Sequence, residues 1–142
     1  MTLFQLGDFT LNSGAASKWK LECDALTDDD WKALAEMVYQ MVGSFYLVEG
    51  VPRGGLKLAE HLKPFSSAVA SHHLIVDDVL TTGGSMLKLK EAYTNQDSDG
   101  DFIGYSQPLK GAVIFARGQC PTWIKALFQC HESLWLKKEL QR

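Results

Sequence analysis

The chain has 142 residues, of which 46% are hydrophobic, and its formal net charge at pH 7 is −3. This length and composition predict one soluble domain, spanning residues 1–142, that buries a hydrophobic core. The weak negative charge argues against a general nucleic-acid-binding protein.

The cysteines and the apolar runs bear on the cellular compartment. The cysteines Cys23, Cys120 and Cys130 are odd in number and lack Cys-x-x-Cys spacing, which favours reduced thiols in the cytoplasm. No apolar run is long enough to span a membrane, and the first residues lack the basic and apolar regions of a signal peptide. We therefore expect a cytoplasmic protein with no membrane partner.

The first predicted element is a half-exposed strand over residues 18–24. Apolar Trp19, Leu21 and Cys23 alternate there with charged residues, and this two-residue period is typical of a strand with one face in water. The turn Ser13-Gly14 precedes the strand, so the segment can also be interpreted as a surface hairpin.

Residues 27–43 carry the clearest helical pattern. Thr27 is an N-cap candidate, and three aspartates follow it where the helix dipole favours negative charge. One apolar stripe runs along the helix, formed by Trp31, Leu34, Ala35, Val38, Met41 and Val42. We expect a packing helix, and we attribute the acidic triplet to helix capping rather than to metal binding.

A strand over residues 45–51 follows, and it ends in the loop Pro52-Arg53-Gly54-Gly55 before a helix over residues 56–62. The glycines let the backbone approach a ligand closely, and the loop also contains a cation. Loops at the carboxyl ends of neighbouring parallel strands form the ligand crevice of open α/β sheets. The sequence therefore predicts a ligand-binding loop here.

The central strand is predicted within residues 73–80. Leu74, Ile75 and Val76 form an uninterrupted apolar run, which is typical of a strand buried on both faces of a parallel sheet. The run ends in two adjacent carboxylates, Asp77 and Asp78. Ionised carboxylates side by side repel each other, so this pair needs solvent, hydrogen-bond donors or cations.

An anion cradle follows the carboxylates. Thr81 and Thr82 offer hydroxyls, while Gly83 and Gly84 permit a tight turn. Ser85 is a candidate N-cap for a helix that ends near residue 94. A glycine loop that leads into a helix N-terminus binds phosphate groups. A ligand with phosphate at one end and hydroxyls at the other, such as ribose 5-phosphate, fits the loop and the carboxylates together.

The interval 63–73 between the two ligand loops is short. It contains Lys63, His72 and His73, and the two histidines can be interpreted as ligand contacts or as a solvated pair at the start of the central strand. A metal site that combines them with the acidic pair is disfavoured, because a strand sends adjacent residues to opposite faces.

The remaining elements are a third buried strand over residues 110–117 and a short helix that ends near residue 128. Between them, Trp123 can stack on a planar base or pack in the core. The acidic stretch 95–101 is expected to lie in solvent. Residues 131–142 predict an amphipathic segment with these candidates for packing or dimer contacts: Leu134, Trp135, Leu136 and Leu140.

The stretch 73–85 resembles the signature of type I phosphoribosyltransferases: apolar residues, an acidic pair, two apolar residues, Thr-Thr-Gly and a small hydroxyl residue. The loop 52–55 is similar to the pyrophosphate-binding loop of that family. Residues 9–24 resemble the N-terminal hood of orotate phosphoribosyltransferases, where Phe-x-Leu-x-Ser-Gly precedes a strand. A lysine commonly precedes the Ser-Gly pair in that family, and Asn12 stands in its place here. The resemblance covers residues from about 9 to 118.

The resemblance implies a type I phosphoribosyltransferase fold, an α/β fold in which helices flank a central, mainly parallel sheet. A small hood, expected at residues about 4–24 and about 118–135, covers the site. The implied reaction transfers 5-phosphoribosyl from 5-phosphoribosyl 1-diphosphate (PRPP) to a ring nitrogen of a nucleobase or related heterocycle and releases pyrophosphate, with Mg²⁺ as cofactor and a homodimer as the assembly. The alternative is a non-catalytic protein of the same fold that binds PRPP or a nucleotide and regulates a partner.

The resemblance also implies roles for the candidate residues. Arg53, Asp77 and Asp78 are expected to be catalytic, and the two aspartates hold the ribose hydroxyls directly or through water and Mg²⁺. The PRPP-binding set is Pro52, Arg53, Gly54, Gly55, Asp77, Asp78, Thr81, Thr82, Gly83, Gly84 and Ser85. The base-binding candidates are Ser13, Lys20 and Trp123. Orotate-type enzymes carry a long mobile loop whose lysine and histidine close over PRPP. Here Lys63, His72 or His73 would take that role, or the lid comes from elsewhere, or turnover is slow.

Overall fold

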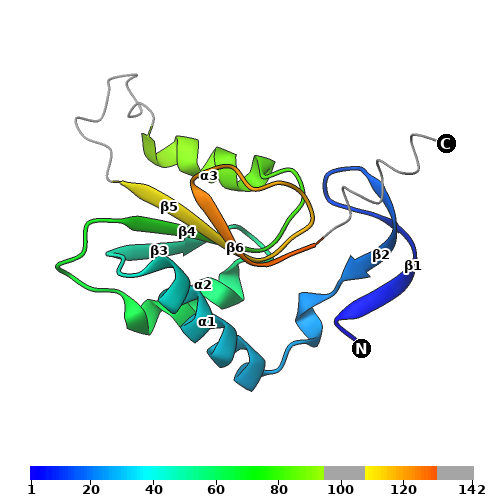
Figure 1. Ribbon diagram of the computed structural model, residues 1–142, viewed down its shortest axis with the longest axis horizontal. Helices are drawn as coiled ribbons and strands as arrows, with labels where there is room; N and C mark the ends of the chain where they lie inside the picture. The colour runs from blue at the N-terminus through cyan, green and yellow to red at the C-terminus, as the bar shows by residue number, and fades with distance from the viewer. Residues whose placement is uncertain (95–107, 131–142) are drawn as a thin grey trace.

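The computed structural model describes residues 1–94 and 108–130, so the predictions for residues 95–101 and 131–142 lie outside the described residues. The chain forms a two-stranded antiparallel sheet followed by a four-stranded parallel sheet that is flanked by helices (Figure 1). In chain order the elements are β1 (Phe4–Thr10), β2 (Ala16–Leu21), η1 (Cys23–Ala25), α1 (Asp28–Val42), β3 (Leu47–Gly50), α2 (Leu56–Leu62), η2 (Lys63–Phe65), β4 (His73–Leu80), α3 (Gly84–Thr94), β5 (Leu109–Ala116) and β6 (Ile124–Gln129).

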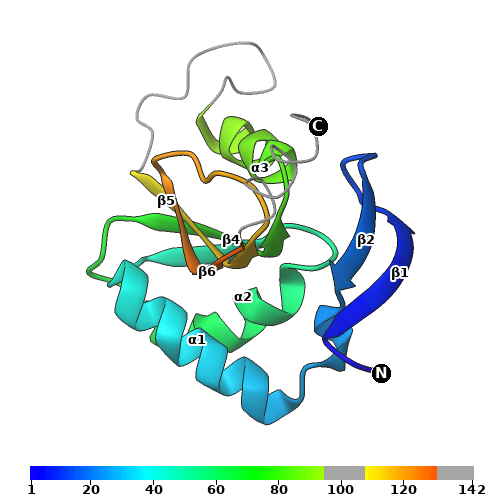
Figure 2. The same ribbon diagram turned by 45° about the vertical axis from the view of Figure 1, so that its right-hand side comes forward.

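The main sheet has the strand order β3-β4-β5-β6, and each neighbouring pair is parallel. Helices α1 and α2 cover one face of the sheet and α3 covers the other (Figure 2). The predicted fold class, with a parallel sheet, flanking helices and a small N-terminal hairpin, is confirmed. Among the described helices, none combines the length and the apolar character needed to cross a membrane.

Strand β4 lies at the centre of the main sheet, between β3 and β5. Leu74 and Val76 are fully buried against α1 and α2, and Ile75 is fully buried on the α3 side. Burial on both faces explains the uninterrupted apolar run. The end of this strand carries Asp77 and Asp78 to the carboxyl edge of the sheet.

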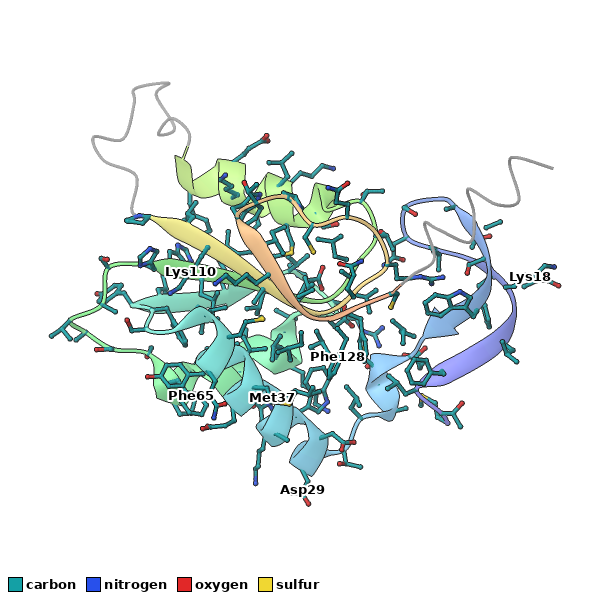
Figure 3. The ribbon with its side chains drawn as sticks, viewed as in Figure 1. Lys18, Asp29, Met37, Phe65, Lys110 and Phe128 are labelled. Atoms are coloured by element: carbon teal, nitrogen blue, oxygen red, sulfur yellow. The ribbon has the colours of Figure 1, made fainter. Side chains whose placement is uncertain are left out.

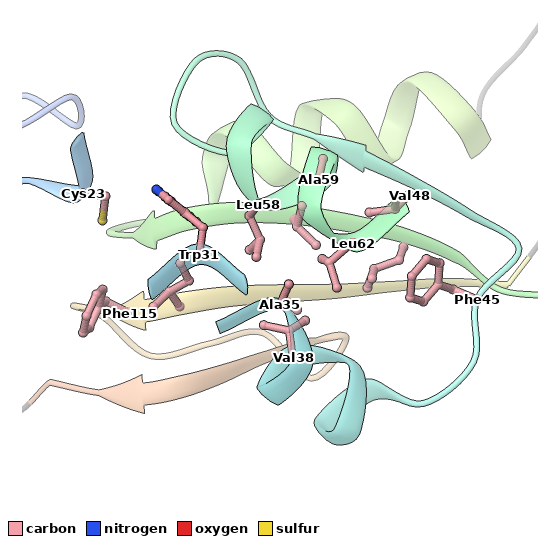
Figure 4. Close-up of a cluster of buried hydrophobic side chains, with 14 residues drawn as sticks. Cys23, Trp31, Ala35, Val38, Phe45, Val48, Leu58, Ala59, Leu62 and Phe115 are labelled. Atoms are coloured by element: carbon pink, nitrogen blue, oxygen red, sulfur yellow. The ribbon is translucent and has the colours of Figure 1, made fainter. Parts of the chain in front are cut away.

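Helix α1 begins with a capping box. The Thr27 hydroxyl accepts a hydrogen bond from the Asp30 N–H at 3.1 Å, and the Asp30 carboxylate accepts one from the Thr27 N–H at 2.9 Å. Trp31, Ala35 and Val38 form the buried face of the helix, within the cluster that lies between α1, α2 and the sheet (Figure 4). The acidic residues at this end therefore serve the helix.

The prediction of a short helix that ends near residue 128 is wrong, because residues 124–129 form the strand β6. Ala126 of β6 lies opposite Val113 of β5, so this part of the predicted second hood element belongs to the main sheet. An edge strand of this length carries too few residues for its pattern to be separated from a helical turn by sequence alone.

The prediction of Ser85 as an N-cap is also wrong. Ser85 lies inside the first turn of α3, because the helix begins at Gly84.

Lys110 of β5 caps the carboxyl end of α1 (Figure 3). Its ammonium donates hydrogen bonds to the carbonyl oxygens of Val42 and Ser44, both at 2.7 Å. We expect Lys110→Met to lower the free energy of unfolding by about 1–2 kcal/mol, because two hydrogen bonds from a charged donor are lost. Urea denaturation measures this change. The control Lys125→Met alters an exposed lysine on β6 and should change stability by less than about 0.5 kcal/mol; equal losses in both variants would contradict the role of Lys110.

Candidate functional site

The loops after β3 and β4 open into one cavity of about 340 Å³ at the carboxyl edge of the main sheet. The core forms one wall, and the hairpin β1–β2 of the hood forms the other with Thr10, Leu11 and Lys20. Two loops far apart in the sequence therefore share one cavity, as neighbouring parallel strands require. Of the residues predicted to bind PRPP or the base, this cavity is lined by Lys20, Pro52, Arg53, Gly54, Asp77, Asp78, Thr81 and Ser85.

The loop 52–55 is held against β4 by its backbone. The Val51 N–H donates to the Val76 carbonyl oxygen at 2.9 Å, and the Gly55 N–H donates to the Val51 carbonyl oxygen at 2.8 Å. A Cβ at Gly55 would lie 2.5 Å from the Val76 oxygen and 2.7 Å from the Val51 nitrogen, so this position has room for glycine alone. The Pro52–Arg53 peptide bond of the loop is cis.

The same loop contacts the acidic pair. A Cβ at Gly54 would lie 2.6 Å from Asp78 Oδ2, so the loop backbone passes directly over this carboxylate. Arg53 lies at the rim of the cavity, where its exposed guanidinium pairs with Asp24 of η1 at 3.0 Å. The structure thus brings the predicted cation and the predicted carboxylates to the same cavity.

Asp77 and Asp78 are half-buried at the end of β4. Asp77 Oδ1 accepts a hydrogen bond from the Asp78 N–H at 2.8 Å, and Asp78 Oδ1 accepts one from the Val79 N–H at 2.7 Å. Burial and the negative charge of Asp78 raise the pKa of Asp77 above its ordinary value of 3.8. Burial and the same Asp78 carboxylate also raise the pKa of the Cys23 thiol. A ligand hydroxyl or a cation would relieve this repulsion between the carboxylates.

The raised pKa of Asp77 predicts a loss of stability as the pH rises. Between the ordinary carboxyl pKa and the raised value, the folded protein keeps a proton that the unfolded chain has released. The free energy of unfolding therefore falls across this interval and is level above it. We expect Asp77→Asn, which stays neutral, to flatten this part of the profile. Urea denaturation at a series of pH values, starting below the ordinary carboxyl pKa, measures the free energy of unfolding of the native chain and of Asp77→Asn. Parallel profiles of the two proteins would contradict the prediction.

The loop 81–85 borders an adjoining cavity of about 200 Å³. Gly83 has a φ of +83°, in the left-handed region that favours glycine, and the Thr82 hydroxyl accepts a hydrogen bond from the Gly84 N–H at 3.3 Å. The first N–H groups of α3 have no acceptor within the helix, which makes them suited to an anion. The hood and α3 complete the wall of this cavity with Asn12, Ser13 and Lys88.

The two cavities adjoin each other. They share five lining residues, namely Asn12, Asp77, Val79, Thr81 and Ser85. A phosphate group in the smaller cavity would therefore place the attached sugar beside the acidic pair. The arrangement can hold one extended ligand with an anion at each end and hydroxyls between them.

Arg117 lines the larger cavity and was missed by the sequence analysis. It is 5% exposed, its guanidinium donates a hydrogen bond to Ser17 Oγ at 2.7 Å, and it lies 3.7 Å from the centroid of the Trp19 ring. Arg117 therefore joins the hood strand β2 to the end of β5. The sequence could have indicated Arg117 by its position, because a charged residue directly after a buried parallel strand lies at the ligand-binding edge of the sheet.

Trp123 is not brought to the site. It lies directly before β6, beside Gly111 near the start of β5, and is absent from both cavity walls. The Lys90 ammonium lies 4.8 Å from the centroid of its ring. These contacts favour the packing interpretation of Trp123.

The interval 63–73 contains three candidates for closing over the ligand, and none of them lines either cavity. These candidates are Lys63, His72 and His73. His73 is buried at the start of β4, where its Nε2 lies 3.9 Å from Glu49 Oε2, and burial lowers its pKa. The interpretation of the two histidines as a solvated pair is therefore wrong for His73.

The acidic pair could hold a metal ion only together with further ligands from a bound molecule. Within residues 1–94 and 108–130, no group of three or more His, Cys, Asp or Glu side chains is arranged to hold a metal ion. Mg²⁺ is commonly bound through one or two carboxylates together with substrate phosphates. Asp77 and Asp78, next to the adjoining cavity at the loop 81–85, suit that mode of binding and do not suit a cage of protein ligands alone.

Solved structures share this architecture. The orotate phosphoribosyltransferase from Aeropyrum pernix matches with a TM-score of 0.68 and 19% identity, over 99% of this chain and 94% of that chain. The Mycobacterium tuberculosis H37Rv orotate phosphoribosyltransferase in complex with Fe(III) dicitrate matches with a TM-score of 0.62 and 14% identity, over 91% and 90%. A phosphoribosyltransferase from Corynebacterium diphtheriae matches with a TM-score of 0.62 and 12% identity, over 80% and 84%.

No family model and no curated protein matches the sequence. The likeness therefore rests on three-dimensional structure, where it extends over nearly the whole chain in the Aeropyrum pernix comparison. The resemblance inferred from the two loops is confirmed at this level, and the chain has the type I phosphoribosyltransferase fold.

Proposed function

We propose that the chain is a PRPP-dependent phosphoribosyltransferase that transfers 5-phosphoribosyl to a ring nitrogen of a nucleobase or related heterocycle and releases pyrophosphate. The observation that carries the proposal is the pair of adjoining cavities lined by the loop 52–55, the acidic pair and the loop 81–85, which share five lining residues. These parts match the diphosphate, the ribose hydroxyls and the 5-phosphate of PRPP. The fold shared with phosphoribosyltransferases supports the same conclusion.

The proposed reaction breaks the bond between ribose C1 and a diphosphate oxygen and forms a bond between C1 and the ring nitrogen, which loses its proton. Positive charge develops on the ribose and negative charge on the leaving diphosphate. The protein therefore needs to hold the reactants in line and to stabilise both charges. The carboxylates of Asp77 and Asp78 hold the ribose hydroxyls and stabilise the positive ribose, while Arg53 and the amides of its loop bind the diphosphate.

The acidic pair would also hold Mg²⁺, directly or through water, once it arrives with PRPP. The metal ion supplies additional neutralisation of the diphosphate charge. Without the metal ion, the carboxylates of the cavity repel a diphosphate. Arg53 offsets this repulsion only in part, because its guanidinium is exposed and paired with Asp24. This electrostatic balance supports a requirement for a divalent cation.

The hood wall supports an acceptor that carries anionic or carbonyl oxygens. Lys20 and Arg117 both line the larger cavity on this side, and Arg117 is buried. A guanidinium on the wall of a cavity can also donate hydrogen bonds to the carboxylate or carbonyl oxygens of a ligand, as in an orotate-like base. Ser13 lines the smaller cavity beside the loop 81–85, so we assign it to the phosphate rather than to the base.

One observation favours a second candidate, a non-catalytic protein that binds PRPP or a nucleotide and regulates a partner. Lys63, His72 and His73 do not line the cavity, so the interval 63–73 supplies no side chain to steady a departing pyrophosphate. An enzyme would then need a lid from elsewhere. A homodimer and a cytoplasmic location remain parts of both proposals.

Pyrophosphate release from PRPP and Mg²⁺, measured with a panel of nucleobases that includes carboxylated pyrimidines, separates the two candidates. We expect release that depends on one member of the panel, together with a nucleotide product of the matching mass. Binding of PRPP without release for any base would favour the regulatory protein. Failure to bind PRPP in calorimetry with Mg²⁺ would contradict the enzyme, and failure to bind either PRPP or a nucleotide would contradict both.

A further inference from the structure

Arg117 is the residue through which the core reaches the hood at the larger cavity. Its guanidinium donates to Ser17 Oγ and lies over the Trp19 ring, and the same residue lines the cavity. Arg117 lies directly after β5, outside the strand pairing, on the side of the sheet that faces the hood hairpin (Figure 1). The place of its guanidinium therefore depends on what fixes the backbone around it.

The end of β4 fixes this backbone from one side. The Arg117 N–H donates to the Leu80 carbonyl oxygen at 2.7 Å. Gly118 packs so closely on the Thr81 carbonyl oxygen that a Cβ at Gly118 would overlap it. The turn 116–118 is thus held against the start of the loop 81–85.

Gln129, the last residue of β6, holds the turn from the other side. Its side-chain amide donates to the carbonyl oxygens of Ala116 at 3.2 Å and of Gly118 at 3.1 Å, the residues before and after Arg117. The same amide also donates to the Cys130 carbonyl oxygen at 3.2 Å. One side chain therefore bridges the two peptide units that flank Arg117.

This bridge does more than satisfy the end of a strand. The Ala116 carbonyl oxygen already accepts a hydrogen bond from the Cys130 N–H at 2.8 Å, so it has a partner without Gln129. The amide adds the connection from Ala116 across to Gly118. Gln129 lines neither cavity, so any effect that it has on a ligand must pass through the turn.

We propose that Gln129 is a positioning residue, whose side-chain amide fixes the turn 116–118 and thereby holds the Arg117 guanidinium between the hood and the cavity. Because a two-stranded hairpin alone is marginally stable, the contacts of Arg117 also stabilise the hood, which forms one wall of the cavity. The effect on the hood is independent of the reaction, whereas an effect on acceptor binding rests on the proposed function.

The first test is hydrogen exchange of the hood in Gln129→Met, followed by mass spectrometry. Methionine keeps the length of the side chain and removes the amide, and Gln129 is exposed, so the fold should remain. We expect residues 16–21 to exchange several-fold faster, because the hood opens more often, and residues 28–42 to exchange as in the native chain. The control Gln40→Met removes an exposed amide that donates to Glu36 at 3.4 Å, and it should leave hood exchange unchanged.

The variant Arg117→Met shows whether Gln129 acts through Arg117. If it does, Gln129→Met will accelerate the exchange of β2 no further in the Arg117→Met background, because both changes remove the same contact. Trp19→Leu, which removes the ring under the guanidinium and leaves the core intact, replaces Arg117→Met should that variant not fold. Unchanged hood exchange in Gln129→Met, or the same acceleration in both backgrounds, would overturn the proposal.

Steady-state kinetics test the consequence for the acceptor. We expect Gln129→Met to raise KM for the acceptor base several-fold with kcat changed less than about twofold, since Arg117 lines the wall assigned to the acceptor. Gln129→Lys, which restores N–H donors, should recover most of this loss. Faster hood exchange with an unchanged KM would overturn the role in acceptor binding. A native chain that turns over no base would contradict the proposed function, and the exchange measurements would still decide the role of Gln129.

Discussion

Under the proposed function, we expect the double variant Asp77→Asn, Asp78→Asn to lose phosphoribosyl transfer by about a thousandfold or more while it keeps its fold. The two carboxylates line the cavity between the loop 52–55 and the loop 81–85. They are the groups that would hold the ribose hydroxyls and a metal ion carried by the diphosphate. Neutral amides cannot stabilise a positive ribose or a cation in the same way. Pyrophosphate release under saturating PRPP and Mg²⁺ measures the loss.

The stability of this variant separates loss of function from loss of fold. Burial and the charge of Asp78 raise the pKa of Asp77, so ionised Asp77 is held at a cost in the folded protein. We expect the double variant to be at least as stable as the native chain above the ordinary carboxyl pKa. Asp29→Asn, the same change on the exposed first turn of α1, is the matched control and should keep full activity. Unchanged turnover of the double variant would refute the assignment of the acidic pair.

The second large effect is expected for Gly55→Ala, which should lower the free energy of unfolding by about 2–3 kcal/mol. A Cβ at this position would lie 2.5 Å from the Val76 carbonyl oxygen and 2.7 Å from the Val51 nitrogen. Both atoms belong to buried backbone, of Val76 within β4 and of Val51 directly after β3, so neither moves without disturbing the pairing of β3 with β4. Urea denaturation measures the change.

Gly84→Ala is the matched control for this substitution. The nearest atom to a Cβ at Gly84 is Thr82 Oγ1 at 3.5 Å, which is ordinary contact, and Gly84 is the first residue of α3. Alanine favours helix over glycine, so we expect a change between zero and a gain of about 1 kcal/mol. A similar loss in both variants would contradict the close approach described for Gly55.

The parts of the site that lie along single stretches of chain could be predicted from the sequence. One such stretch is the run Leu74-Ile75-Val76 with Asp77 and Asp78 after it. A strand buried on both faces must be apolar, and charged residues can follow only where the strand reaches the edge of the sheet, so this pattern alone predicts the buried strand and the acidic pair. The glycine positions of the two loops followed from the same local argument. The strand order of β3 and β4 then brings the loops together.

The parts of the site that depend on contacts between distant elements could not be predicted in the same way. Arg117 lines the candidate cavity because β5 ends under the hood, where Ser17 and Trp19 contact it. Trp123 lies away from both cavity walls because the chain turns back to start β6 beside Gly111. Local patterns do not contain these pairings, which depend on how the hood and the edge strand settle on the core.

A crystal structure of the protein with PRPP and Mg²⁺ tests directly whether the two loops bind one ligand. We expect a single PRPP molecule with its 5-phosphate on the amides of the loop 81–85, its ribose hydroxyls at Asp77 and Asp78, and its diphosphate at the loop 52–55. A PRPP molecule on another surface, or one that contacts a single loop and leaves the acidic pair untouched, would contradict it.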